Sequence, residues 1–291
     1  MPLPSPIVIG VETMVRGEFK KSEPRQTVAD LTADDRAILE RECKQNSAFD
    51  ELNARHEMFE HVITKGNTRP AIRQSREGKI IALLQEEEQA AQIPWNLWFR
   101  ILRLFYRDNP YRIFLCAHPH RRMFPPKNRK ITPLNINGGY TYPCDNSCIV
   151  IYRAEDATRV LIHELLHASC TDNTTLGVDL IEAETEAWAE LLYVGLLSRG
   201  IHAVFVRLIR EQSTLMRMQN EYIRRNYIGR DSMEFPWRYT IGKEAVWHRW
   251  GILYNGTLPR TNPTSLRLTI TPTEEQKREN NVSIDKSSTI L

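Results

Sequence analysis

Apolar positions along this chain follow two different periods. Up to about residue 110 they recur every three or four residues, which predicts helices over 32–58, 76–92 and 95–105. Between 111 and 152 the apolar runs are short and rich in β-branched and aromatic residues, which predicts strands over 112–116, 134–142 and 148–152. The helical spacing then returns and predicts helices over 155–170, 179–198, 201–226 and 242–254. Helices that precede and follow a few strands in the sequence indicate a mainly helical α+β fold with a small mixed sheet.

The same pattern divides the chain into four regions. Residues 1–30 are polar with scattered prolines, so we expect a loose N-terminal segment there. A helical N-terminal region follows over 31–110, and a region of mixed structure spans 111–258. Thr, Asn, Pro and charged residues dominate 259–291, which predicts a largely disordered tail.

Composition excludes two kinds of partner. With 41% hydrophobic residues in 291 positions, the chain can bury a substantial core. The net charge is only +3 and no long Lys/Arg block occurs, so we expect no nucleic-acid partner. No apolar run approaches the roughly eighteen residues of a membrane helix, so we expect no membrane association. The apolar run at 6–11 is too short for a signal peptide.

The five cysteines are odd in number and scattered, which predicts reduced thiols and an intracellular, cytoplasmic location. The pair Cys144 and Cys148 leaves open a disulfide or a pair of metal ligands. The run from Cys116 to His120 also suggests metal binding, but it lacks a matching second pair.

The strongest chemical signal lies in the predicted helix over 155–170. His163 and His167 are four residues apart, so both imidazoles leave one face of the helix about one turn apart. That separation suits one zinc ion, and Glu164 would reach a water molecule held by it. Two histidine ligands and a glutamate general base form the HExxH arrangement. The alternative is a core helix with hydrogen-bonded histidines, which is disfavoured because burying these groups without a metal is costly.

The next predicted helix carries Glu182, Glu186 and Glu190, spaced by four and therefore on one face. Three carboxylates on one half-buried stripe repel each other unless a cation lies there. A third zinc ligand is the simplest explanation, and a solvated acidic face is the alternative.

These residues resemble the zincin metallopeptidases of the gluzincin kind, which carry HExxH on one helix and a glutamate ligand on a later one. Eighteen residues separate His167 from Glu186, a spacing typical of the aminopeptidase branch, so the resemblance implies Glu186 as the third ligand. That branch has Asn-Glu-Gly-Phe-Ala around its ligand, and this chain has Thr-Glu-Ala-Trp-Ala over 185–189. In thermolysin-like members an aspartate four residues after the glutamate ligand supports a zinc histidine. In this chain Glu190 occupies that position. The Gly-x-Met-Glu-Asn substrate motif is absent, so the resemblance, over 160–192, implies a zinc site and hydrolysis but no substrate.

The resemblance further implies a zincin-like domain with its sheet beside the HExxH helix, and a zinc-dependent peptidase acting on protein or peptide. Glu164 would take the proton of the attacking water and pass it to the leaving amine. The oxyanion needs a further donor, which in gluzincins is a Tyr or His several tens of residues after the glutamate ligand. Tyr239, His248 and Tyr254 are eligible, and Tyr239 is preferred because it lies in a predicted loop before a helix.

In zincins a sheet edge lies along the cleft, and an extended peptide adds to it as a further strand. We expect either 135–142 or 148–152 to be that edge. The run over 135–167 is also similar to uncharacterised metallopeptidase-like proteins of large DNA viruses, which implies a viral origin.

Two other classes of function compete with a peptidase. One is a catalytically inactive zinc-binding protein, a pseudopeptidase or regulatory protein; the other is a helical binding protein without metal. The intact Glu164 disfavours the first, because a structural zinc site needs no base and fills its fourth position with protein. Metal content and the activity of Glu164→Gln distinguish the three. The sequence indicates neither the substrate nor the oligomeric state.

Overall fold

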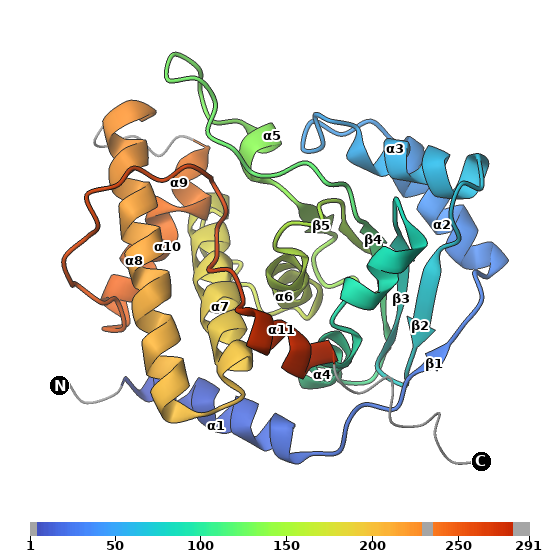
Figure 1. Cartoon of the computed structure of the whole chain (residues 1–291), viewed down its shortest axis with the longest axis horizontal. Coiled ribbons are helices and arrows are strands. Elements are labelled where there is room, and N and C mark those ends of the chain that lie inside the picture. The colour runs from blue at the N-terminus through green and yellow to red at the C-terminus, as the bar shows by residue number, and fades with distance from the viewer. Residues whose placement is uncertain (1–4, 229–234, 282–291) are drawn as a thin grey trace.

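A mixed sheet with helices on both faces forms the centre of the molecule (Figure 1). The computed structural model describes residues 5–228 and 235–281. In spatial order the strands are β1 (Thr27–Val28), β2 (Ala71–Gln74), β3 (Gly78–Leu83), β4 (Tyr111–Cys116), β6 (Ile149–Ile151) and β5 (Gly139–Thr141). The predicted α+β class, mainly helical with a small mixed sheet, is confirmed.

Strand direction places β5 at an edge of this sheet. β3, β4 and β6 run parallel, whereas β5 pairs antiparallel with β6, Tyr140 lying opposite Val150. The run over 135–142 therefore contains the edge strand. The alternative edge, 148–152, is wrong, because β6 pairs with β4 on one side and β5 on the other.

Side chains that alternate along the strands build two cores. One face of the sheet packs against α2 (Ala33–Lys44) and α3 (Ala54–Phe59); its buried residues include Ile81, Leu83, Phe114, Cys116 and Val150. The opposite face packs against α4 (Trp95–Phe105), α6 (Ala157–Ala168) and α7 (Val178–Ser198); its buried residues include Ile80, Ala82, Ile113, Leu115, Ile149 and Ile151. A period of two therefore buries both faces of β3, β4 and β6.

Helix α7 is the axis of the helical half. It packs against α6, α8 (His202–Asn226), α10 (Ile241–Arg249) and α1 (Pro6–Lys20). Gly195 permits the close approach of α1, since a Cβ there would lie 2.9 Å from Val11 Cγ1. Shorter elements complete the fold: α5 (Pro133–Ile136), α9 (Pro236–Tyr239), α11 (Glu274–Asn281), a π-helical turn over Glu60–Thr64 and a 3-10 helix over Glu87–Gln92. None of the helices described is long and apolar enough to cross a membrane.

The N-terminal half differs most from its prediction. The predicted helix over 76–92 is instead β3 and the 3-10 helix, because its apolar run is short and buried on both faces of the sheet. The helix predicted over 32–58 begins with a capping box at Thr32, as its sequence suggests, but stops at Lys44 and resumes as α3 at Ala54.

The predicted regions also share one core. The described part of the segment expected to be loose, residues 5–30, contains α1, which buries Val8, Val11 and Val15 against the helical half. Within the predicted disordered tail, Leu266 and Leu268 are fully buried and α11 packs on α4; residues 282–291 lie outside the described residues. One apolar cluster joins α1, the sheet, α4, α6 and α7, so the expected boundaries at 30 and 110 do not separate independent units.

Candidate functional site

Helix α6 brings the two motif histidines together beneath the edge of the sheet. Its apolar residues, including Leu161, Ile162 and Leu165, are buried, which leaves one face of the helix for His163 and His167. The Nε2 atoms of the two rings lie 3.1 Å apart, and the ring planes meet at 78°. The predicted pairing of these histidines on one helix face is therefore present.

The structure brings Glu182 of α7 to these nitrogens. Its Oε2 lies 3.5 Å from Nε2 of His163, and its Oε1 lies 3.9 Å from Nε2 of His167. One ligand atom from each of the three residues lies within 4.8 Å of the others. Fourteen residues separate His167 from Glu182, fewer than the eighteen that the family spacing led us to expect.

Glu186, the expected third ligand, lies one turn further along α7 and behind His163. Its Oε1 is 3.1 Å from Nδ1 of His163, on the far side of the ring from His167. Its other oxygen pairs with the guanidinium of Arg159, and Lys243 Nζ lies 3.8 Å away. The geometry thus differs from the prediction, because the glutamate that faces the two Nε2 atoms lies in the second turn of α7 and not in the third.

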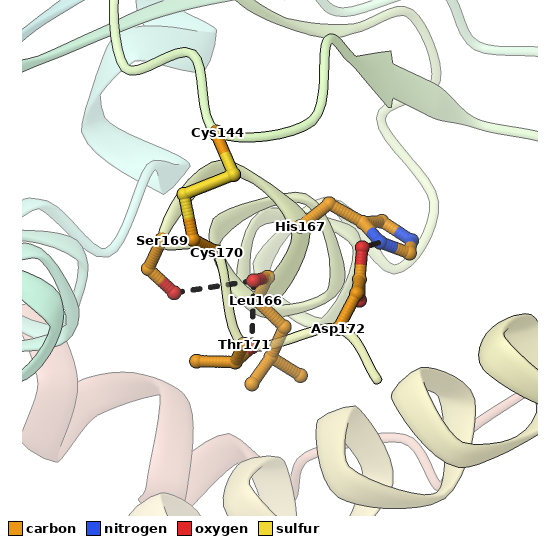
Figure 2. The surroundings of a disulfide bond; sticks show 7 residues. All are labelled: Cys144, Leu166, His167, Ser169, Cys170, Thr171 and Asp172. Carbon is orange, nitrogen blue, oxygen red and sulfur yellow. Dashed lines mark hydrogen bonds and ion pairs between the residues drawn. A yellow bond between two sulfur atoms is a disulfide. The ribbon is translucent and has the colours of Figure 1, made fainter. Parts of the chain in front are cut away.

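Each histidine therefore has a carboxylate at its Nδ1. For His167 this is Asp172, whose Oδ2 lies 2.7 Å from Nδ1 in a hydrogen bond (Figure 2). Such carboxylates orient a ligand ring and select the tautomer that leaves the other nitrogen free for a metal. Sequence reasoning missed Asp172, although an acid just beyond the end of the motif helix is a usable signal.

The donor set fits a divalent cation. Oε2 of Glu182 is buried and has no hydrogen-bond partner among the described residues. Burial lowers the pKa of His163 to about 4, so its ring is neutral at neutral pH, as a metal ligand must be. Burial also disfavours the charged form of Glu182, but the histidines outweigh it and lower the pKa of that carboxyl. Burial disfavours the charged form of His167 as well, but the carboxylates of Glu164, Glu182 and Asp172 outweigh it and raise the pKa of that ring, so a metal bound there would displace a proton. Two imidazoles and one carboxylate are a zinc donor set that leaves a fourth position open.

Glu164 lies on the side of α6 that faces the edge strand. It is 5% exposed, and this burial raises the pKa of its carboxyl to about 8. A Cβ on Gly139 of β5 would lie 3.1 Å from Oε1 of Glu164 and 2.6 Å from Val160 Cγ1. Glycine at this position thus lets the edge strand lie directly against the candidate base.

Glu190, expected to support a zinc histidine, lies deeper still. Its Oε1 accepts a hydrogen bond from Lys243 Nζ at 2.8 Å and lies 3.3 Å from Nε of Arg159. Within the described part of the chain it contacts neither motif histidine. Glu190 therefore belongs to a buried charge cluster with Arg159 and Lys243 that fixes α6 and α10 to α7.

A cavity of about 200 Å³ opens at the histidines and runs along α6. Its walls come from residues 136–141 with β5, from α6 and α7, and from four residues of other segments: Phe49, Arg122, Tyr239 and Leu268. Of the three expected oxyanion donors, Tyr239 lines the cavity, whereas His248 and Tyr254 are exposed elsewhere. Burial raises the pKa of Tyr239, which keeps its hydroxyl protonated and able to donate.

Two of the five cysteines are bonded, so the prediction of reduced thiols throughout is wrong. Cys144 forms a disulfide with Cys170, and not with Cys148, which is buried and free (Figure 2). Cys116 is also free, 4.0 Å from the thiol of Cys43. Among the described residues the His163–His167–Glu182 group is the one cluster that could hold a metal ion, so the second metal site suggested near Cys116 does not form.

Comparisons with protein-family models, with curated proteins and with solved structures found no match to this chain. The geometry of this site and the motif are therefore what indicate a function.

Proposed function

We propose that this protein is a zinc-dependent peptidase of the zincin type. The observation that carries the proposal is the convergence of Nε2 of His163, Nε2 of His167 and the Glu182 carboxylate at the mouth of one cavity. A buried glutamate and the free edge of a strand lie beside the same cavity. A metal site without catalysis explains the convergent ligands, but it gives no role to the buried glutamate or to the free strand edge.

In this proposal His163, His167 and Glu182 hold the zinc, and Asp172 and Glu186 orient the two rings. A zinc ion supplies Lewis acidity and makes water a nucleophile at neutral pH. Glu182 replaces Glu186 in the expected ligand set, because an Nδ1 that faces a carboxylate 3.1 Å away is directed away from the shared centre.

Glu164 acts as the general base. A carboxyl with a pKa near 8 accepts a proton readily from a nucleophile and returns it readily to a leaving amine, because its pKa lies close to neutral pH. Its position between the histidines and β5 places that proton transfer beside any peptide bond that lies along the strand.

The substrate lies along β5. Tyr140 and its neighbours pair with β6 on one side, and on the other the strand borders the cavity. An unpaired strand edge presents peptide N–H and C=O groups to an added strand, so an extended peptide is the class of substrate that this edge recognises. Tyr239, which lines the same cavity, donates its hydroxyl hydrogen to the oxyanion that forms during attack.

The test combines metal content with cleavage of a mixture of peptides of diverse sequence. We expect about one zinc per wild-type chain and cleavage that a chelator abolishes. Glu164→Gln should keep the zinc and lose cleavage by several orders of magnitude. Zinc with no cleavage of any peptide by the wild type would support the inactive zinc-binding alternative, and absence of zinc after reconstitution would reject both.

A further inference from the structure

The disulfide lies at the point where α6 leaves the candidate metal site (Figure 2). Cys170 comes just after the end of α6, and Cys144 lies in the loop that joins β5 to β6. The backbone N–H groups of both cysteines donate to the carbonyl oxygen of His167, each at 3.1 Å. The bond therefore ties the edge-strand loop to the last turn of the metal-site helix, at the residue that carries one of the two Nε2 atoms.

The segment after Cys170 folds back over the end of this helix. Thr171 donates from its hydroxyl to the carbonyl of Leu166 at 2.7 Å, and Ser169 donates to the same oxygen at 3.1 Å (Figure 2). This short turn delivers Asp172 to Nδ1 of His167. From the other side, Asp172 is held by one hydrogen bond of 3.3 Å, donated by the hydroxyl of Thr185 on α7.

The disulfide joins two residues that have unusual backbone conformations. Cys144 has φ 62° and Cys170 has φ 58°, a left-handed conformation that is unfavourable for residues with a Cβ. The covalent bond holds the two residues in this conformation and so fixes the turn that carries Asp172. Without the bond, relaxation at Cys170 moves a carboxylate that lies only two residues away.

We propose that the Cys144–Cys170 disulfide is a positioning element of the metal site: it holds Asp172 on His167 and thereby sets the affinity for zinc. The proposal depends on the metal centre of the proposed function and adds to it a dependence on oxidation state. Both cysteines of the bond are exposed, whereas the three free cysteines are buried, so a reductant in solution reaches this bond. With a water-soluble phosphine, the S–S bond takes up two electrons and two protons, and the phosphine and one water become the phosphine oxide.

The experiment measures the dissociation constant for zinc by competition with a chromophoric chelator. The full chain is compared in three forms: oxidised wild type, phosphine-reduced wild type, and Cys144→Ser/Cys170→Ser. Partners that orient a ligand histidine typically change metal affinity by about 10–100-fold. We expect a loss of that size, equal in the reduced and the substituted forms. Phosphine added to the double variant is the matched control, and should change nothing because that variant lacks the bond.

A double-mutant cycle between the disulfide and Asp172→Asn distinguishes the positioning of Asp172 from a general loosening of the fold. If the disulfide acts through Asp172, Asp172→Asn alone weakens zinc binding to a similar extent, and removing the disulfide from that variant adds little. Fully additive losses, or equal zinc affinity in the oxidised and reduced wild type, would overturn the proposal while leaving the metal centre intact. Absence of zinc binding by the oxidised wild type would instead reject the metal centre itself.

Discussion

Oε1 of Glu186 lies 3.1 Å from Nδ1 of His163, the ring nitrogen on the far side from His167. Glu182, one turn earlier on the same helix, lies 3.5 Å from the other nitrogen of that ring. A single imidazole thus separates two glutamates that the sequence places on one helix face. In the proposed metal site the two nitrogens of the ring give the glutamates different roles, because the Nε2 side would hold the metal and the Nδ1 side faces Glu186.

The first prediction concerns these two glutamates. Glu182→Ala removes an anionic ligand, so we expect loss of stoichiometric zinc, measured as metal per chain after dialysis. Glu186→Gln keeps the size of the side chain and its acceptor oxygen, so we expect zinc to remain with an affinity about 10–100-fold weaker. Retention of zinc by Glu182→Ala together with its loss from Glu186→Ala would restore the ligand set that the family spacing suggests.

The second prediction concerns Tyr239, which lines the cavity. Its hydroxyl is expected to donate to the oxyanion, and loss of one such donor typically lowers kcat by about 10²–10³-fold. Tyr239→Phe should therefore lower kcat by that factor and leave the zinc content unchanged. Tyr254→Phe and His248→Ala serve as controls, because both residues are exposed away from the cavity and should keep wild-type rates. A rate for Tyr239→Phe equal to that of these controls would exclude Tyr239 as the donor.

The motif helix and the helices after it were predictable, because their apolar residues keep a helical period over long stretches. The two histidines were predictable as a pair, because they lie four residues apart on one helix. The third ligand was harder. Glu182, Glu186 and Glu190 share one face of α7, and the sequence specifies that face but not how far along it the histidines lie. That distance depends on how α7 crosses α6, which is a tertiary property. Asp172 was missed for a similar reason, since it reaches His167 only through a turn that a disulfide holds.

The strands of the sheet were hard to predict for a different reason, because a short apolar run fits more than one kind of secondary structure. The run over 80–84 is apolar at all five positions, which suits a buried helix segment as well as a strand. Pairing decides the matter, because β3 forms ladders with both β2 and β4 and buries both of its faces. Cys144 and Cys148 likewise suggested a local pair from their spacing, whereas the fold carries Cys148 into β-sheet packing and leaves Cys144 beside Cys170.

The third prediction concerns the contact between β5 and α6. A Cβ at Gly139 would lie 2.6 Å from Val160 Cγ1 and 2.9 Å from the carbonyl oxygen of Val150. Gly139→Ala should therefore lower the free energy of unfolding by about 1–3 kcal/mol, measured with urea, and should slow peptide cleavage. Gly17→Ala is the matched control, because nothing lies within 4 Å of a Cβ at that helical position. Equal stability of the two variants would show that β5 does not press on α6 as described.

The fourth prediction concerns the stability of the metal-free protein as a function of pH. Burial raises the pKa of Glu164 from 4.5 to about 8 in the folded state. Between these values the unfolded chain is ionised at this residue while the folded protein holds the proton, so the unfolded state binds fewer protons. The contribution of Glu164 to stability must then fall as pH rises from about 4.5 to about 8, and level off above that range.

Glu164→Gln removes this titration, so it should gain stability over the wild type as pH rises through that window, by on the order of a few kcal/mol. Urea unfolding of both chelator-treated proteins at pH 5, 6.5 and 8 measures the difference. Glu40→Gln changes a half-exposed carboxyl on α2 and should show no such gain, because a hydrogen bond from Lys44 lowers the pKa of Glu40. A constant difference between wild type and Glu164→Gln across the three pH values would mean that Glu164 is ionised in the folded protein. Its capacity as a base would then have to come from the metal site and not from its burial.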